Sequence, residues 1–424
     1  MLGSRRWRGD APARYHVPMP RLREFVRGPW RAVAVLGVTQ ILAWGTLFYP
    51  PVLTMPLIAA DLGWSIAFCM SGLSIGLMSA GLAAPTVGRL IDRYGGGLVM
   101  TAGSLVGAAG LFALAHSANR AIYLGVWVVL GISLAASLYD ASFATLGRIF
   151  GPAARQPITL LTFAGGFAST VSWPATHVLL DAYGWRTTYL VYAGLLAFVA
   201  APLHGLALPR QRAELQPPAR AGAPPPVAVL PARGVPFVLV ATGFAAYSFV
   251  PSGMSAHLLA IFGRAGIDAG TVVTIGALFG PSQVASRLFE FTFGGGTHPL
   301  AIARSAVTLV LCAFVLLALA GISAVPAAAF AIMFGVSNGL ITIARGTVPL
   351  TMFGAAGYGR LVGRLAAPWL AMQAAAPLVL AFVVEHASDA AALAVTAGFA
   401  AVALVSLLIL RPTAAKPRAP DMMS

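Results

Sequence analysis

Charged residues are scarce in this chain of 424 residues, and their scarcity indicates its class. Charged side chains make up 9% of the sequence, whereas hydrophobic residues make up 58%. Soluble globular proteins usually carry about 25% charged residues, so this chain has too little polar surface to face water. We therefore expect an all-α membrane protein whose main partner is the lipid bilayer.

Cysteines and chemical motifs are also few. Cys69 and Cys312 are far apart and lie inside apolar segments, which argues against a disulfide framework or a metal-ligand cluster. The sequence has no nucleophile elbow, phosphate-binding loop or dinucleotide-binding glycine pattern, so we expect no catalytic residues, cofactor or metal, and no enzyme activity. The net charge of +15 does not indicate a nucleic-acid partner, because the arginines are scattered between apolar runs.

Long hydrophobic runs fill most of the chain. A spanning helix needs about 20 mostly apolar residues. We predict twelve of them, at residues 31–55, 65–87, 97–117, 121–147, 156–179, 186–207, 235–262, 269–289, 299–321, 325–352, 363–385 and 389–410. Residues 208–234 are rich in proline, alanine and arginine, which is typical of a flexible linker. We expect a tail at 1–30, a six-helix bundle at 31–207, the linker at 208–234, a second bundle at 235–410 and a tail at 411–424.

Positive charges predict the orientation in the membrane. With the N-terminus inside, only Arg120, Arg186 and Arg264 of the 27 lysines and arginines fall on the outer side. Basic residues favour cytoplasmic loops. No clear cleavage site follows the first apolar segment, so residues 1–30 are expected to be a tail and not a removed signal peptide. We therefore expect a multi-pass protein of the plasma (inner) membrane with both termini and the linker cytoplasmic.

The two halves of the chain resemble each other. Residues 89–97 contain Arg-Leu-Ile-Asp followed by three glycines, and residues 287–296 contain Arg-Leu-Phe-Glu followed by three glycines. Phe150-Gly151 and Phe353-Gly354 form a second matching pair in the same order. The repeat predicts two pseudo-symmetric six-helix bundles, with a site between them near the bilayer midplane.

One loop carries a family resemblance. Residues 88–95, with the sequence GRLIDRYG, resemble the signature loop of the major facilitator superfamily, although glycines follow where a basic residue is usual. Gly184-Trp185-Arg186 and Arg155 are also similar to the family pattern, and residues 61–65 resemble the monocarboxylate and oxalate/formate branch. The resemblance covers nearly the whole chain. It implies a secondary transporter that works by alternating access and functions as a monomer.

The same resemblance implies an inner gate. Gly88 would allow two helices to approach closely, and Asp92 could accept hydrogen bonds across the two bundles. Arg148 stands where related proteins often have an acid, so we expect Asp92 to pair with Arg148 or Arg93. In the second half, the candidates for a related role are Arg287 and Glu290. The alternative is that all these groups simply face water and lipid headgroups.

Two charged residues stand deep inside predicted spans. A charge at the bilayer centre costs at least roughly 2.5–3.5 kcal/mol, so Asp140 and Arg345 are candidates for a buried functional site. The repeat places them at nearly equivalent positions in the two halves, from which they could approach each other. Weaker candidates with polar groups at membrane depth are Gln40, Trp44, Tyr49, Tyr247, Asn338 and Gln373. Packing between helices is the alternative explanation for these residues.

These residues favour a carrier of a small organic anion such as a monocarboxylate. Arg345 would bind the anion, since the planar guanidinium matches a carboxylate. Burial favours the neutral form of a carboxyl group and a nearby arginine favours its charged form, so Asp140 could carry a proton. Proton coupling and exchange of one anion for another both fit. The alternative is a proton-driven efflux pump for organic cations or drugs, in which Asp140 would attract the positive charge.

Overall fold

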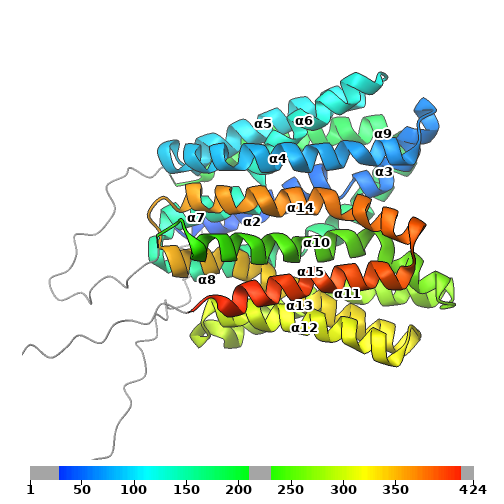
Figure 1. The fold of residues 1–424 in the computed structure, drawn as a ribbon. Coiled ribbons are helices and arrows are strands. Elements are labelled where there is room, and N and C mark those ends of the chain that lie inside the picture. Colours follow the sequence, from blue (N-terminus) through cyan, green and yellow to red (C-terminus); the bar gives the residue numbers. More distant parts are fainter. Residues whose placement is uncertain (1–27, 210–230, 412–424) are drawn as a thin grey trace, which may run out of the picture.

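The computed structural model describes residues 28–209 and 231–411, which form long helices packed side by side (Figure 1). The first half contains α2 (Arg31–Ala43), η1 (Trp44–Phe48), α3 (Pro51–Leu62), α4 (Ile66–Tyr94), α5 (Gly96–Ala115), α6 (Arg120–Ser137), α7 (Tyr139–Phe150), η2 (Gly151–Ala154), α8 (Arg155–Gly165), α9 (Ala168–Leu195), η3 (Leu196–Ala200) and η4 (Leu203–Ala207). The second half contains α10 (Val235–Arg264), α11 (Ala269–Phe293), η5 (Gly294–Gly296), α12 (Pro299–Ala320), α13 (Ala324–Phe353), α14 (Tyr358–His386) and α15 (Asp389–Ile409). No strand occurs in these ranges.

The described residues cross the membrane twelve times. Nine segments in these ranges are long and apolar enough to span a bilayer, and one of them, Arg120–Ala207, has 88 residues. A straight helix of that length would exceed a hydrocarbon core of about 30 Å roughly fourfold. Gly151 and Gly184, with φ of 55° and 72°, turn the chain and divide this segment into three passes. The remaining pass is α11, whose polar side chains, including Arg287 and Glu290, lower its hydropathy.

The all-α, twelve-helix expectation is therefore confirmed, with some changes in helix boundaries. The first pass runs to Leu62 instead of residue 55. It contains a π-helical turn at Trp44–Phe48, and α3 restarts at Pro51, which has no N–H to donate to a preceding turn. This pass is therefore built from two helices joined at mid-length.

The fourth pass is broken, although we expected one continuous helix over 121–147. Leu138 is extended, with φ −86° and ψ −167°, so α6 ends at Ser137 and α7 begins at Tyr139. Gln40 donates from Nε2 to the Ser137 carbonyl over 2.7 Å. This side chain supplies a hydrogen-bond partner at the break, where a buried carbonyl needs one. Asp140 consequently lies in the first turn of a new helix.

The residues next to the linker and to the tails lie at one end of the bundle, which we call the loop end. It is the end where α4 meets α5 at Gly95. There the Trp30 ring lies 5.3 Å from the Phe150 ring, and Arg304 at the start of α12 binds the carbonyls that end α15. The turn between α3 and α4 at Gly63 lies at the opposite end. The division into tails, bundles and linker stays a prediction.

Candidate functional site

Asp140 and Arg345 meet at the centre of the bundle. Asp140 comes from α7 in the first half and Arg345 from α13 in the second, and Oδ1 lies 3.3 Å from Nη2. Their side chains are only 15% and 13% exposed. The break at Leu138 brings the first turn of α7 to this depth, where the helix N-terminus favours a carboxylate. The pair therefore joins the two halves through buried opposite charges.

Aromatic rings surround the guanidinium group of Arg345. Its Cζ lies 4.6 Å from the centre of the Trp369 ring and 5.9 Å from that of Phe143. Such positions over ring faces attract a cation. The Nε of Arg345 is buried and has no hydrogen-bond partner among the described residues. One donor of the guanidinium therefore stays available for another acceptor.

Two small cavities adjoin the pair. The larger, about 20 Å³, is lined by Asp140, Arg345, Gln373 and the apolar or aromatic residues Trp44, Phe48, Leu77, Ala84, Leu134, Ala135, Leu138, Trp369 and Leu370. The smaller, about 10 Å³, lies between Asp140 and the glycines Gly88, Gly359 and Gly363. A cavity of roughly 10–15 Å³ holds one water molecule. Each cavity therefore has room for about one water molecule beside the ion pair.

Asp92 joins the halves at the loop end. Its carboxylate accepts hydrogen bonds from the backbone N–H groups of Gly359 and Arg360, over 2.9 and 2.7 Å. These groups belong to the first turn of α14, so Asp92 of the first half caps a helix of the second half. A Cβ at Gly88 would lie 2.1 Å from the Gly359 carbonyl oxygen, which explains the glycine. We call the contacts of Asp92 with Gly359 and Arg360 the loop-end latch.

The expected pairing of the Asp92 carboxylate with an arginine is wrong. Arg148 donates to the backbone carbonyl of Asp92, and the Arg93 guanidinium lies over the Tyr94 ring at 5.0 Å. The carboxylate instead faces the free N–H groups at the start of α14. Those groups have no partner within their own helix, so they compete well for an acceptor.

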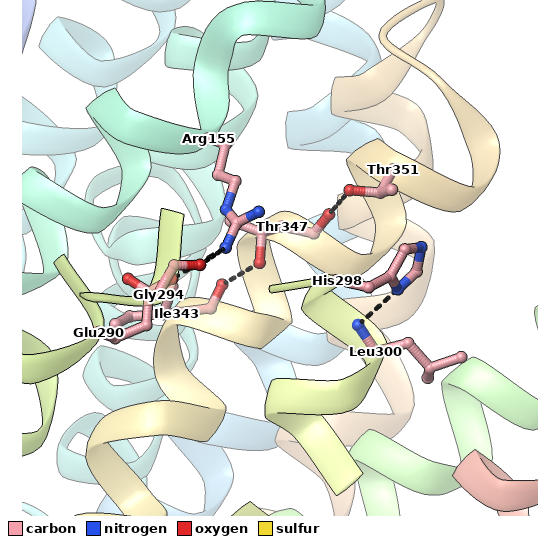
Figure 2. A network of polar contacts seen from close by, with 8 residues as sticks. All are labelled: Arg155, Glu290, Gly294, His298, Leu300, Ile343, Thr347 and Thr351. Carbon is pink, nitrogen blue, oxygen red and sulfur yellow. Dashed lines mark hydrogen bonds and ion pairs between the residues drawn. The ribbon is translucent and has the colours of Figure 1, made fainter. Parts of the chain in front are cut away.

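Residues of the second half make related contacts. Arg155 donates to Glu290 over 3.1 Å and to the Gly294 carbonyl over 2.8 Å, as Figure 2 shows. Arg287 is 3% exposed and donates over 2.6 Å to the carbonyl of Thr162 in the first half. Both contacts join the halves, as does the loop-end latch. Glu290 and Arg287 therefore have different partners, and neither faces open water.

At the opposite end, ion pairs stay within one half. Arg186 pairs with Asp61, both in the first half. Arg264 pairs with Asp389 over 2.6 Å, both in the second half. The contacts of Asp92, Arg155 and Arg287 thus hold the halves together at the loop end, while these two ion pairs hold each half together at the other end.

Comparison with known proteins identifies the family to which the chain belongs. The sequence profile described as Major Facilitator Superfamily matches residues 33–357. The chain belongs to the Major Facilitator Superfamily. It is a multi-pass membrane transporter, not an enzyme, and its fold is the twelve-helix major facilitator fold of two pseudo-symmetric bundles.

Curated relatives match only a part of this superfamily member. Monocarboxylate transporter 3 of Rattus norvegicus is 35% identical over 122 residues, which are 28% of this chain and 24% of that protein. Monocarboxylate transporter 1 of Bos taurus is 30% identical over 131 residues, which are 30% of this chain and 25% of that protein. The matched part thus spans about a quarter of the length of these relatives.

Solved structures match over nearly the full length. The human organic anion transporter MFSD10 (TETRAN) has a TM-score of 0.68 at 18% identity, covering 92% of this chain and 100% of that chain. The transporter FucP in the outward conformation has a TM-score of 0.68 at 13% identity, covering 89% of this chain and 97% of that chain. At such identities the likeness shows the fold alone.

In this transporter the side chain of Gln40 positions neighbouring groups of the site through hydrogen bonds. Its Nε2 donates to the Ser137 carbonyl and, over 2.9 Å, to Ser142 Oγ, and its Oε1 accepts from Trp44 Nε1 over 3.1 Å. The amide of Gln40 is therefore occupied, and the residue lines neither cavity. It fixes the Trp44 ring and the break in the fourth pass.

The other predicted residues divide into two groups. Trp44 and Gln373 line the larger cavity, and Tyr49 packs its ring 5.9 Å from that of Trp44. Tyr247 is buried and bonded to Ser337 over 2.9 Å, and Asn338 lines neither cavity. The roles of Tyr247 and Asn338 stay predictions, since neither residue lines a cavity in this conformation and helical spacing alone does not show which face of a helix meets the other half.

The sequence reasoning missed Trp369, whose indole ring packs against the guanidinium group of Arg345. Trp369 had a usable signal, since it lies one turn before Gln373 on the same face of α14.

Proposed function

We propose that the protein is a secondary active transporter of a small organic anion, a monocarboxylate, that works by alternating access. The observation that carries this proposal is the buried pair of Asp140 and Arg345, with each partner in a different half. Arg345 supplies a fixed positive charge, and its only acidic partner among the described residues can be neutralised by a proton. The partial similarity to monocarboxylate transporters supports the same substrate class.

The exchange of partners at Arg345 links binding to protonation. In the empty carrier Asp140 balances the charge of Arg345. An arriving carboxylate takes the place of Asp140 on the planar guanidinium fork. Asp140 is then a buried carboxylate without its cation, and burial favours its protonated form. One anion and one proton therefore cross together, and exchange follows when the site is refilled by another anion before the proton leaves.

Rocking of the halves exposes this site to either side of the membrane. The described conformation is closed at the loop end by the latch and by the contacts of Arg155 and Arg287. The carrier opens toward that side when these contacts break. We further propose that the loop end faces the cytoplasm in an inner membrane, since described arginines such as Arg89, Arg93 and Arg360 lie there, and that one chain forms the whole pathway.

Buried charge argues against the efflux of cations. The charge of Asp140 is already engaged by Arg345, and Arg287 adds a second buried positive charge nearby. An organic cation entering this site would meet two guanidinium groups and one carboxylate. Such a site repels cations more than it attracts them, so we propose no second function.

The test is uptake of labelled monocarboxylates into liposomes that contain the purified protein and carry an inward proton gradient. We expect uptake to require Arg345, so that Arg345→Ala abolishes it. Asp140→Asn should keep exchange of internal for external anion but lose acceleration by the proton gradient. Arg264→Ala, which breaks an exposed ion pair at the opposite end, is the matched control and should keep both activities. Uptake that is unchanged in Arg345→Ala would contradict the proposal.

A further inference from the structure

Few polar groups at the larger cavity are free to bind a substrate. Trp44 Nε1 and both ends of the Gln40 amide are bonded to one another or to Ser137 and Ser142. Among the described residues, the free groups are the Nε of Arg345 and the side-chain amide of Gln373, which makes no side-chain hydrogen bond there. A substrate with several hydroxyl groups or a second carboxylate would bury polar groups without partners, which is costly.

The rings of Trp44, Phe48 and Trp369 line the same cavity beside six aliphatic residues. From Trp44, ring contacts run to Phe48 at 4.9 Å and to Tyr139 at 5.3 Å, and Tyr139 stacks on Phe143 at 5.4 Å with an angle of 10°. Phe143 lies below the Arg345 guanidinium and Trp369 lies on it. Trp44 and Trp369 line the cavity from different halves. The hydrogen bond from Nε1 to Gln40 fixes the Trp44 indole, so it presents its ring surface and not its N–H group.

We infer that the transported anion has a single carboxylate and an aromatic body, which is held between Trp44 and Trp369 while the carboxylate binds Arg345. This inference rests on the proposed function and narrows its substrate class. The available donors match one carboxylate, and the surrounding rings match a planar apolar group. Aromatic pairs in offset or edge-to-face contact gain stability beyond the area they bury, which amounts to roughly two- to tenfold in affinity for each contact.

The geometry also assigns the two tryptophans different tasks. Trp369 touches both the guanidinium and the cavity, so it orients the group that binds the carboxylate as well as the body. Trp44 does not touch the guanidinium, and its contacts are with other aromatic rings and with Gln40. A change at Trp44 should therefore alter selection of the substrate body with little effect on binding of the carboxylate.

The experiment compares initial uptake rates of four labelled anions by the wild-type protein in liposomes: phenylacetate, cyclohexylacetate, lactate and succinate. Phenylacetate and cyclohexylacetate have nearly the same size and charge and differ in aromaticity. We expect phenylacetate to have a KM several-fold below that of cyclohexylacetate and at least tenfold below that of lactate, with succinate excluded. This comparison needs no variant, so it does not depend on the folding of one.

Three outcomes are distinguishable. A lower KM for phenylacetate supports the inference. Transport of lactate in preference to phenylacetate, or equal KM values for phenylacetate and cyclohexylacetate, overturns it and leaves the proposed function standing. Uptake of none of the four anions, or preferential transport of the dicarboxylate succinate, overturns both.

Variants at Trp44 and Trp369 test which ring causes the lower KM for phenylacetate. Trp44→Leu should raise the KM for phenylacetate about tenfold, leave that for cyclohexylacetate nearly unchanged and leave kcat similar. Trp369→Leu should raise the KM for both anions, since it also frees the Arg345 guanidinium. Phe198→Leu removes a ring that is 83% exposed on the outer surface, and this control should change neither KM. Retention of the phenylacetate preference in Trp44→Leu would overturn the assigned role of Trp44.

Discussion

The backbone of Gly88 packs directly against that of Gly359, and a methyl group at Gly88 would lie 2.1 Å from the Gly359 carbonyl oxygen. The two glycines belong to α4 and α14, which lie side by side in Figure 1 and come from different halves. Backbone atoms cannot retreat as the end of a flexible side chain can. Closure of the loop end therefore depends on the missing side chain at Gly88.

We predict that Gly88→Ala prevents closure at the loop end. The added methyl group should hold α4 and α14 apart and expose the smaller cavity beside Asp140. The measurement is labelling of a cysteine introduced as Ala141→Cys, in a background with Cys69→Ser and Cys312→Ser. Labelling by a thiol reagent added on the loop-end side should rise severalfold and transport should be lost. Gly125→Ala, where a Cβ meets nothing within 4 Å, is the control.

We predict that Asp92→Ala destabilises the closed conformation less than Gly88→Ala does. Loss of a helix cap costs about 1 kcal/mol, which changes the ratio of closed to open molecules about fivefold. Labelling of the same cysteine should rise accordingly, and transport should be reduced but present. Asp92→Asn keeps one acceptor oxygen and should lie between wild type and Asp92→Ala. Equal labelling in all three proteins would show that the latch does not control access.

Substitutions at Asp140 and Arg345 should have nonadditive effects on the free energy of unfolding. Arg345→Ala leaves Asp140 buried without a partner, and removal of one member of a buried pair is destabilising by roughly 3–5 kcal/mol. The double variant Asp140→Asn/Arg345→Ala removes both charges and should therefore melt at a higher temperature than Arg345→Ala alone. Thermal unfolding in detergent measures this order. A double variant that is less stable than Arg345→Ala would show that the two charges do not compensate each other.

A pH effect is expected at His298, which precedes α12. Its Nδ1 accepts a hydrogen bond from the Leu300 N–H group over 3.1 Å, as Figure 2 shows. Burial, together with the positive charges of Arg155 and Arg304, lowers the pKa of His298 from its ordinary value. The unfolded state therefore binds a proton more readily than the folded state does. Stability is complete above the unfolded pKa of about 6.5 and falls as the pH drops toward the folded value.

The variant His298→Asn tests this expectation. Asparagine is a good cap that does not titrate, so the melting temperature of the variant should fall less than that of the wild type between about pH 7.5 and pH 5. His116→Asn, at an exposed histidine on the opposite end, is the control and should follow the wild type. Parallel pH profiles for wild type and His298→Asn would contradict the assignment.

Hydropathy was sufficient to predict the twelve passes, because each pass must hide its backbone from lipid within its own helix. The break at Leu138 was not predictable in this way, since neither proline nor glycine stands there. It depends on Gln40, which is 97 residues away in sequence and donates to the Ser137 carbonyl. Local patterns do not contain such a partner.

The charges of the site were predictable and most of their partners were not. Asp140 and Arg345 are conspicuous because ionisable groups are rare in spanning segments. The partners of Asp92 are backbone N–H groups of α14, which have no signature in the sequence. Tyr247 and Trp369 were equally plausible by depth, and only the packing of α14 against the first half shows that Trp369 meets the cavity.

The ion pairs of Asp61 with Arg186 and of Arg264 with Asp389 each fasten two segments of the same half. When the halves separate at that end, neither carboxylate loses its guanidinium and no charge has to be rehydrated there. Separation at the loop end, in contrast, uncovers the carboxylates of Asp92 and Glu290. Separation of the halves at the loop end would therefore expose more charge to water than separation at the opposite end, so we expect the rate of opening at the loop end to depend on the ionic strength on that side.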